Sequence, residues 1–204
     1  RINGLGTENV ARACKKINAK MIYISTDFVF DGKKRSPYTE DDEPNPLSIY
    51  GWSKYEGELA VKKHLDNYLI VRTAWLYGPF GRNFVETILR LAEEEGPLKV
   101  VNDQIGTPTY TMDLASAIGT LIEKDAMGIV HVTNSGSCSW YEFAKKILEL
   151  AGRQKEVVPI TSEELARPAV RPKYSVLDCT RYREITGEEL RSWESALHDY
   201  LSST

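Results

Sequence analysis

Helical segments and short apolar runs alternate along the first half of the chain. A helical pattern that Thr7 can cap precedes the run MIYIS, a second over residues 48–65 precedes YLIVR, and a third over 84–95 precedes LKVV. Helices that alternate with buried strands are typical of parallel sheets with crossover helices. The pattern therefore predicts an α/β fold built on a doubly wound parallel sheet.

The second half of the chain continues this alternation with less regular spacing. Helical periodicity covers residues 112–124, 139–151 and about 188–201, and the run IVHVTN between the first two is typical of a strand. Two polar loops, at 31–46 and 163–174, are long, which favours a role in binding.

The charge and cysteine content narrow the choice of partner and compartment. The 26 basic and 29 acidic residues are dispersed and give a net charge of −3, which argues against a nucleic-acid partner. Cys14, Cys138 and Cys179 form no C-x-x-C pair, which indicates a reducing compartment, the cytoplasm. No run of about 18 apolar residues occurs, so we expect no membrane span.

Polar side chains follow two of the predicted strands at their carboxyl ends. The stretch Ser25-Thr26-Asp27 comes after MIYI, and Thr73-Ala74-Trp75 comes after YLIVR. Ligands of doubly wound sheets bind beyond the carboxyl ends of the strands. We therefore expect a functional site where these two strands end.

The stretch SIYGWSK places Tyr50 and Lys54 four residues apart on the second predicted helix. Residues at this spacing are neighbours, and an ammonium near a phenol favours the ionised form of the phenol. Such a pair can exchange protons near neutral pH. The same spacing at Tyr141 and Lys145 follows no strand-end hydroxyl, and with eleven tyrosines in the chain one such pair is expected by chance. Spacing alone leaves a surface pair as the alternative.

Two glycines in the helix of Tyr50 and Lys54 distinguish this pair from Tyr141 and Lys145. Gly51 and Gly57 each cost a helix about 1 kcal/mol relative to alanine. A helix that keeps two glycines often has something packed close against it. We expect a cofactor or a partner helix there.

Five blocks along the chain resemble the extended short-chain dehydrogenase/reductase superfamily, and within it the dTDP-4-dehydrorhamnose reductases. They are YISTDFVFDG, SIYGWSKYEGE, VRTAWLYGPFGRNFV, VNDQIGTPTYTMDLA and RPKYSVLD, in the order of that family, from about residue 3 to residue 178. The resemblance implies a Rossmann-like sheet with a smaller C-terminal α/β region. It also implies NADPH- or NADH-dependent reduction of the C4 keto group of dTDP-4-dehydro-L-rhamnose, and a homodimer, with Mg²⁺ at the dimer interface in some members.

The resemblance assigns catalytic roles to Thr26, Tyr50 and Lys54. Tyr50 is expected to protonate the sugar carbonyl oxygen as hydride arrives, and Thr26 to hydrogen-bond that oxygen. Lys54 is expected to hold the nicotinamide ribose and to tune Tyr50. Ser25 and Thr73, together with Tyr50 and Lys54, are the expected cofactor-binding residues.

Further residues are candidates for binding the sugar nucleotide. Asp27 could bond a sugar hydroxyl or only cap a turn, and Trp75 could pack against the sugar ring or belong to the core. The loop GPFGRNF places an arginine and an asparagine before a helix, where an anion can bind. The remaining candidates are Arg82 and Asn83 in that loop, Gln104, which resembles the nucleotide contact of the family, and Arg171, with Arg167 as its competitor for a diphosphate.

One element of the family is missing from the sequence. No G-x-x-G-x-x-G turn follows a first strand, so we expect roughly the first third of the family fold to be absent. On this basis residues 1–77 and about 107–125 form the rest of the dinucleotide-binding domain, and 78–106 and 126–204 form the substrate-binding region. The choice between NADH and NADPH stays open.

The sequence leaves two alternatives to a dTDP-4-dehydro-L-rhamnose reductase. A non-catalytic regulatory subunit, resembling that of methionine adenosyltransferase, could keep the same helix and strands. Another sugar-nucleotide epimerase or a dehydratase would share the Thr26, Tyr50 and Lys54 trio. The blocks around Trp75 and Gln104 fit this last class less well, and a dehydratase would need a second carboxylate after Asp27, where Phe28 stands.

Overall fold

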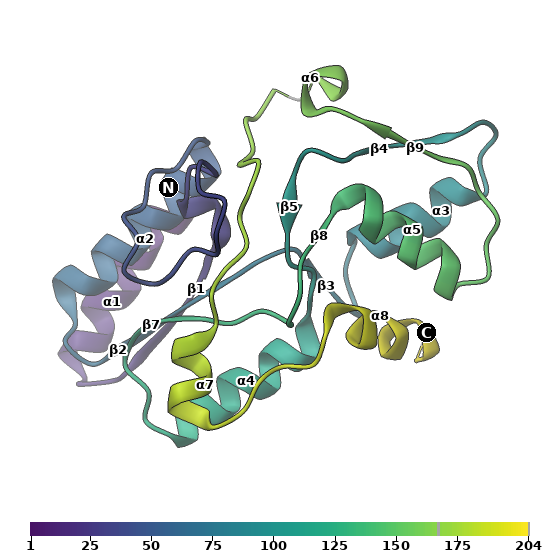
Figure 1. The fold of residues 1–204 in the computed structure, drawn as a ribbon. Helices are drawn as coiled ribbons and strands as arrows, with labels where there is room; N and C mark the ends of the chain where they lie inside the picture. Colours follow the sequence, from purple (N-terminus) through teal and green to yellow (C-terminus); the bar gives the residue numbers. More distant parts are fainter. Residues whose placement is uncertain (167, 204) are drawn as a thin grey trace.

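The computed structural model describes residues 1–166 and 168–203 and places them in two packed regions (Figure 1). The first region contains a parallel three-stranded sheet in the order β1-β2-β7. Its strands are β1 (Met21–Thr26), β2 (Tyr68–Thr73) and β7 (Gly128–His131). The chain therefore has the predicted α/β fold with a parallel sheet.

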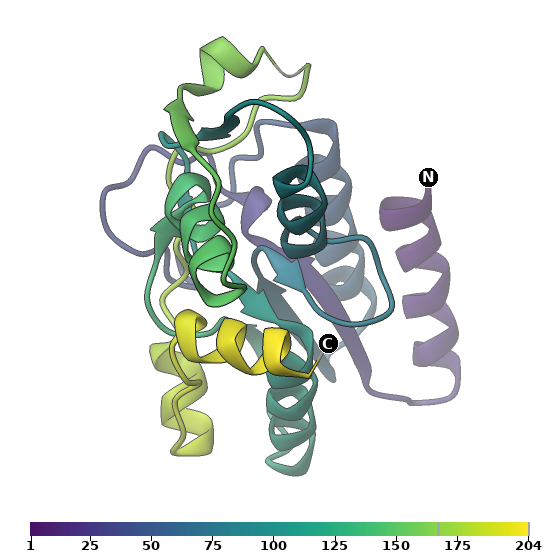
Figure 2. The same cartoon turned by 90° about the vertical axis from the view of Figure 1, so that its right-hand side faces the viewer.

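Helices cover both faces of this sheet, because its strands are apolar on both sides (Figures 1 and 2). On one face lie α1 (Thr7–Lys16) and α2 (Ile49–His64), whose Ala11 and Val61 pack against Ile70 of β2. On the other face lie α4 (Thr111–Glu123) and α7 (Thr180–Thr186). Alternate residues of β2 thus enter two different cores.

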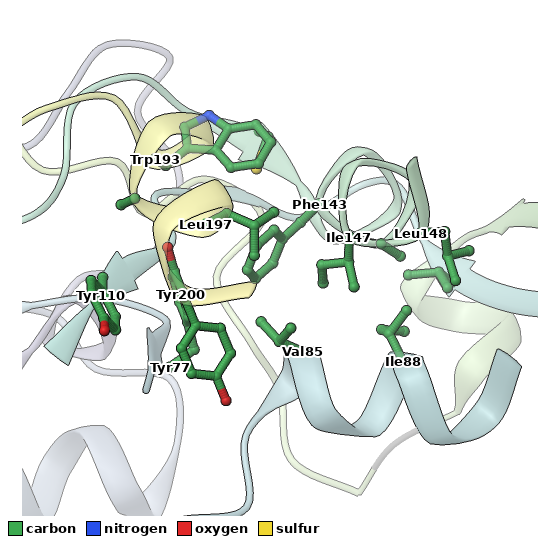
Figure 3. Close-up of a cluster of buried hydrophobic side chains, with 14 of the residues drawn as sticks. Tyr77, Val85, Ile88, Tyr110, Phe143, Ile147, Leu148, Trp193, Leu197 and Tyr200 are labelled. Carbon is green, nitrogen blue, oxygen red and sulfur yellow. The ribbon is translucent and has the colours of Figure 1, made fainter. Parts of the chain in front are cut away.

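The second region has its own core, formed by three helices and a strand pair (Figure 3). The helices are α3 (Phe84–Ala92), α5 (Trp140–Leu150) and α8 (Trp193–Ser202). The strands β4 (Leu98–Val101) and β9 (Val157–Ile160) pair in parallel. Phe143 lies at the centre of this core, fully buried, with aromatic rings from several elements around it.

Short elements join the two regions. A parallel pair links β3 (Leu76–Tyr77) to β6 (Thr109–Tyr110), and an antiparallel pair links β5 (Ile105–Gly106) to β8 (Cys138–Ser139). The remaining elements are the π-helical turn η1 (Ile2–Gly6), the 3₁₀ turn η2 (Asp27–Val29) and the short helix α6 (Ser162–Leu165). Among the described residues, no helix is long and apolar enough to cross a membrane.

The structure corrects several sequence predictions. LKVV forms a strand, β4, but it pairs with β9 and not with the main sheet. Thr7 does not cap α1, because the turn η1 leads directly into the helix and Gly6 takes the cap position. The predicted C-terminal helix begins only at Trp193, and α7 precedes it as a separate helix that the sequence pattern did not reveal.

The predicted division into two regions stays a prediction. The strand β7 follows the proposed boundary at about residue 125, yet it pairs with β2 in the main sheet. The pairing joins Leu69 to Gly128 and Arg72 to His131. This part of the predicted substrate-binding region is therefore continuous with the main sheet.

The two glycines of α2 lie where the helix approaches β1 and η2 most closely. A Cβ at Gly51 would overlap the carbonyl oxygen of Phe28, and one at Gly57 would overlap the Tyr23 hydroxyl and the Asn3 carbonyl. The close neighbours are thus the chain's own backbone and the Tyr23 ring, in place of the cofactor or partner helix expected from sequence.

Gly51→Ala is expected to destabilise the protein by about 1–3 kcal/mol, because the Phe28 carbonyl is backbone and cannot turn aside. Urea denaturation measures the effect. Gly119→Ala in α4 is the matched control, since nothing lies within 4 Å of its added methyl group. Relief of the helix cost of glycine should stabilise that variant by up to about 1 kcal/mol. Equal effects of the two substitutions would contradict the close-packing account.

Candidate functional site

The ends of β1 and β2 meet at one cavity of about 280 Å³. The parallel register places Ser25 opposite Arg72 and Thr26 opposite Thr73, so the residues after both strands emerge side by side. The cavity is lined by Ser25, Thr26, Asp27, Phe28, Tyr50, Thr73, Ala74, Trp75, Leu76 and Trp140. Five of the predicted site residues on the two strand ends, and Tyr50 from α2, thus share one space.

Local interactions bring Tyr50 to this cavity. The Ser48 side chain caps α2 by accepting a hydrogen bond from the Gly51 amide at 3.1 Å, which fixes where the helix begins. The absent side chain of Gly51 lets this first turn approach Phe28. The Phe28 ring then meets Tyr50 edge to face, with 6.0 Å between ring centroids. Tyr50 keeps 49% of its surface exposed.

The electrostatic surroundings keep the Tyr50 phenol protonated. Partial burial raises the pKa of Tyr50, and the nearby Asp27 charge adds to this rise, whereas a side-chain hydrogen bond with Thr26 opposes it. A phenol with a pKa above 10 holds its proton at neutral pH. Tyr50 therefore has the protonation state of a general acid, and the electrostatic surroundings do not favour the ionised form that a nearby ammonium was expected to favour.

The Lys54 amine lies against the backbone of β1. Its Nζ donates to the Ile24 carbonyl at 2.5 Å and sits 4.2 Å from the centroid of the Tyr23 ring. Burial lowers the pKa of Lys54, and the charge of Glu58 acts in the opposite direction. Lys54 is therefore held one residue before Ser25, close to the end of the strand.

Thr26 and Asp27 form a hydrogen-bonded pair at the end of β1. The Thr26 hydroxyl donates to Asp27 Oδ1 at 3.0 Å and accepts from the Phe28 amide at 3.2 Å. Burial raises the pKa of Asp27 to about 6, although hydrogen bonds from Ser175 and Thr26 act against this rise. Asp27 thus serves the turn and also lines the cavity, so both of its predicted roles remain compatible with the structure.

Two polar atoms at the cavity are buried without a hydrogen-bond partner among residues 1–166 and 168–203. They are the hydroxyl of Thr73 and Oδ2 of Asp27. Buried polar atoms normally find a partner, so these two indicate that a polar ligand completes the site. A hydroxyl-rich group such as a nicotinamide ribose or a sugar fits them, and Thr73 is a predicted cofactor-binding residue.

The Ser25 hydroxyl, unlike that of Thr73, has a hydrogen-bond partner within the chain. It donates to Glu58 of α2 at 2.5 Å, and Glu58 also binds Arg72 of β2. The sequence reasoning missed both charged residues. The available signal was a charged residue inside the apolar run YLIVR, because arginine is rarely buried unless it is paired.

Trp75 has its ring in a stack with Trp140. The two indoles lie parallel, with centroids 3.6 Å apart and an interplanar angle of 8°. The backbone at Trp75 is left-handed, with φ of +45°, and Gly106 leaves room for the indole, since a Cβ there would come within 2.5 Å of it. Trp140, which the sequence reasoning missed, comes from the same segment as the Tyr141 and Lys145 pair.

Trp140 also lines a second cavity, of about 160 Å³. Gln104 and Arg171 both line it, between α3, β4 and α6. The Gln104 amide donates to the Ser162 hydroxyl at 2.8 Å, a partner 58 residues away in the chain. Arg167, the competitor of Arg171, lies outside the described residues.

Arg82 and Asn83 line neither the strand-end cavity nor the cavity of Gln104 and Arg171. Arg82 lines a separate cavity of about 650 Å³ together with Tyr110 and Tyr200. Asn83 caps α3 through a bond from the Glu86 amide at 3.1 Å, and its amide group donates to the Gly78 carbonyl at 3.0 Å. The structure therefore gives Asn83 a role in shaping the loop, and it does not bring either residue to the strand-end cavity.

The second Tyr-x-x-x-Lys pair is also separate from the strand ends. Tyr141 and Lys145 line a different surface hollow, where the Lys145 amine sits 5.4 Å from the Tyr141 ring centroid. Within the described part of the chain, no group of three or more His, Cys, Asp or Glu side chains could hold a metal ion. The divalent ion that the resemblance implies at a dimer interface stays a prediction.

Comparison with known proteins gives consistent matches over the whole chain. The family described as the RmlD substrate binding domain matches residues 1–204. The spore coat polysaccharide biosynthesis protein SpsK of Bacillus subtilis is 48% identical over 200 residues, covering 98% of this chain and 70% of that protein. The dTDP-4-dehydrorhamnose reductase of Streptomyces griseus is 45% identical over 203 residues, covering 96% and 67%.

A solved structure shares the same fold. The crystal structure of dTDP-4-dehydrorhamnose reductase from Bacillus anthracis, in complex with NADP, matches with a TM-score of 0.96 and 46% sequence identity. The match covers 99% of this chain and 72% of that chain. The chain therefore belongs to the RmlD substrate binding domain family, alongside relatives named dTDP-4-dehydrorhamnose reductase.

Proposed function

We propose that the protein is an NAD(P)H-dependent reductase that converts dTDP-4-dehydro-L-rhamnose to dTDP-L-rhamnose. The observation that carries the proposal is the meeting of Thr26, Tyr50 and Trp75 around one cavity at the ends of β1 and β2. The names of the relatives and the NADP in the related crystal structure support the choice of substrate and cofactor.

The chain's own residues supply the acid and the stabilisation of charge. A reduced nicotinamide, when bound, supplies the hydride to the carbonyl carbon. Tyr50 gives its phenolic proton to the carbonyl oxygen. The Thr26 hydroxyl, which donates its one hydrogen to Asp27 Oδ1 in the structure, turns from Asp27 and donates to the same oxygen as negative charge develops. The alcohol that results carries one new C–H bond and one new O–H bond.

Binding of the two ligands falls to different groups around the cavity. Lys54, Ser25 and Thr73 are proposed to hold the cofactor, and the unpartnered Thr73 hydroxyl supports this assignment. Asp27 and the face of Trp75 are proposed to bind the sugar.

The nucleotide is assigned to the cavity beside Trp140, where Gln104 and Arg171 can bind the base and the diphosphate. Arg82 and Asn83 do not line this cavity, and a contact of either residue with the sugar nucleotide is supported only by the family resemblance.

We also propose a cytoplasmic location and a homodimer for the protein. The three cysteines are free thiols, which suits the cytoplasm. The family resemblance supports a homodimer. Exposed apolar side chains at the start of α2, among them Ile49 at 90% exposed and Trp52 at 51%, provide surface for such a contact.

Tyr50→Phe should lower kcat by about 10²–10⁴-fold, because it removes the proton donor and no buried carbon. Oxidation of NADPH or NADH in the presence of dTDP-4-dehydro-L-rhamnose measures this, and thermal unfolding should be unchanged. Tyr141→Phe is the control, since Tyr141 has the same spacing to a lysine but lies at another hollow. Full activity of the Tyr50 variant would remove Tyr50 from the mechanism.

Asp27→Asn should make stability less dependent on pH. The folded pKa of Asp27 is raised from 3.8 to about 6, so the folded state binds the proton more tightly than the unfolded state does. Its contribution is therefore fully present below pH 4 and is lost as the pH rises through 6, by up to about 3 kcal/mol. Urea denaturation of both proteins between pH 4 and 7 measures the difference. A constant gap across this range would show that Asp27 titrates normally.

A further inference from the structure

A fully buried carboxylate on α2 binds both strands that carry the site. Glu58 Oε1 accepts from the Ser25 hydroxyl at 2.5 Å and from Arg72 Nε at 2.9 Å, and its Oε2 accepts from Arg72 Nη2 at 2.7 Å. The side chains of Glu58 and Arg72 are 0% and 1% exposed. The carboxylate therefore has three donors and no access to water.

The outer side of the Arg72 guanidinium is enclosed as well. It lies 5.1 Å from the centroid of the Phe30 ring, and its Nη1 is 3.5 Å from His131 Nε2. Because arginine can only donate, Nε2 must accept, and the Nδ1–H of His131 then donates to the Tyr38 carbonyl at 3.1 Å. Burial and the Arg72 charge lower the pKa of His131 to about 3, in agreement with this neutral tautomer.

The positions of these residues in the chain connect the pair to the proposed chemistry. Glu58 follows Lys54 by four residues and Tyr50 by eight, so the three lie along neighbouring turns of α2. Ser25 directly precedes Thr26, and Arg72 directly precedes Thr73. One carboxylate thus joins the helix and the two strands whose next residues line the cavity.

Stability alone does not account for such a pair. Burying two charges costs about as much as their attraction returns, and apolar residues of similar volume are often equally good or better. A bidentate pair does, however, fix geometry, because both nitrogens and both oxygens must align. The pair therefore fixes the position and rotation of α2 relative to β1 and β2.

A second contact transmits this alignment to Lys54. The Tyr23 hydroxyl of β1 donates to the Lys54 carbonyl at 3.2 Å, beneath the Lys54 amine that rests over the same ring. Movement of α2 along β1 would change the distance between this amine and the end of the strand.

We propose that Glu58 is a positioning residue of the reductase, which with Arg72 and Ser25 sets the register of Tyr50 and Lys54 against Thr26. The inference rests on the proposed function for its catalytic consequence. Glu58 touches neither substrate nor cofactor and acts through α2 and the two strands.

The same carboxylate also affects the charge of Lys54. The charge of Glu58 acts to raise the pKa of Lys54 against the effect of burial. The groups that face Lys54 are the Tyr23 ring from β1 and Glu58 on its own helix, while Arg72 and Ser25 face the carboxylate from the strands. Removal of the Glu58 charge should therefore let the titration of Lys54 move to lower pH.

Glu58→Gln tests the proposal with two independent readouts. Steady-state kinetics should show kcat lower by about 10–100-fold with KM for the sugar nucleotide within about threefold, since positioning acts on the reacting geometry. Acetic anhydride labelling of Lys54 across a pH series, followed by mass spectrometry, should show its midpoint at lower pH than in the wild type. This second readout needs neither substrate nor cofactor.

Glu8→Gln is the matched control. It makes the same chemical change at another carboxylate that links α1 to α2, where Glu8 lies 2.9 Å from His64 Nε2. Both readouts should stay at wild-type values in this variant. A folded Glu58→Gln protein with wild-type kcat and an unshifted Lys54 midpoint would overturn the proposal.

Arg72→Lys covers the case in which Glu58→Gln does not fold. It keeps the positive charge and replaces the two-bond fork with a single ammonium. A lower kcat with KM retained supports the proposal, and wild-type kcat overturns it. If the wild type itself fails to reduce the sugar nucleotide, the proposed function fails, while the labelling of Lys54 still decides whether Glu58 controls that residue.

Discussion

The Glu58–Arg72 ion pair holds α2 to the sheet at the point where the site is built. Apolar contacts alone leave a helix some freedom to slide and rotate on a sheet, because the hydrophobic effect is not directional. The bidentate pair restricts that freedom, and the tight approach of Gly51 and Gly57 to Phe28 and Tyr23 restricts it further. Together these contacts fix the position of α2 along β1 and β2, and at that position Tyr50 lies at the strand ends.

The site also depends on the second region of the fold. Trp140 comes from α5, in the core of that region, and stacks on Trp75 at the end of β2. Trp140 lines both the strand-end cavity and the cavity of Gln104 and Arg171. A sugar nucleotide has a sugar and a nucleotide that require different surroundings. In the proposed function these are the two cavities that Trp140 lines.

Burial shifts the protonation equilibria of the titratable groups around the strand-end cavity. Partial burial raises the pKa of Tyr50 and lowers that of Lys54, and full burial raises that of Asp27. A protonated phenol is the form that a reduction needs, since the carbonyl oxygen gains a proton. The nearby hydroxyl of Thr26 acts against the rise in the Tyr50 pKa.

Much of this protein follows from the sequence alone, and the remainder from tertiary contacts. Periodicity predicts α2, β1, β2, α4 and α5, because an amphipathic helix or an apolar strand is a local property. The strand-end stretches at Thr26 and Thr73 were predictable as neighbours, because parallel strands end on the same edge. The resemblance of five motif blocks gave the family. Periodicity does not reveal which strand a run will pair with, so the pairing of β4 with β9 was seen only in the structure.

The roles of Glu58, Arg72 and Trp140, and the contact of the Asn83 amide with Tyr200, were decided only by the tertiary structure. Each depends on a partner far away in the sequence: Trp140 on Trp75, Arg72 on Glu58, and the Asn83 amide on Tyr200. A buried charge is tolerated only where its counter-charge arrives, and an indole stacks only where another ring is presented. The sequence determined which groups are available and on which elements they lie. The packing of the two regions determined which of them meet.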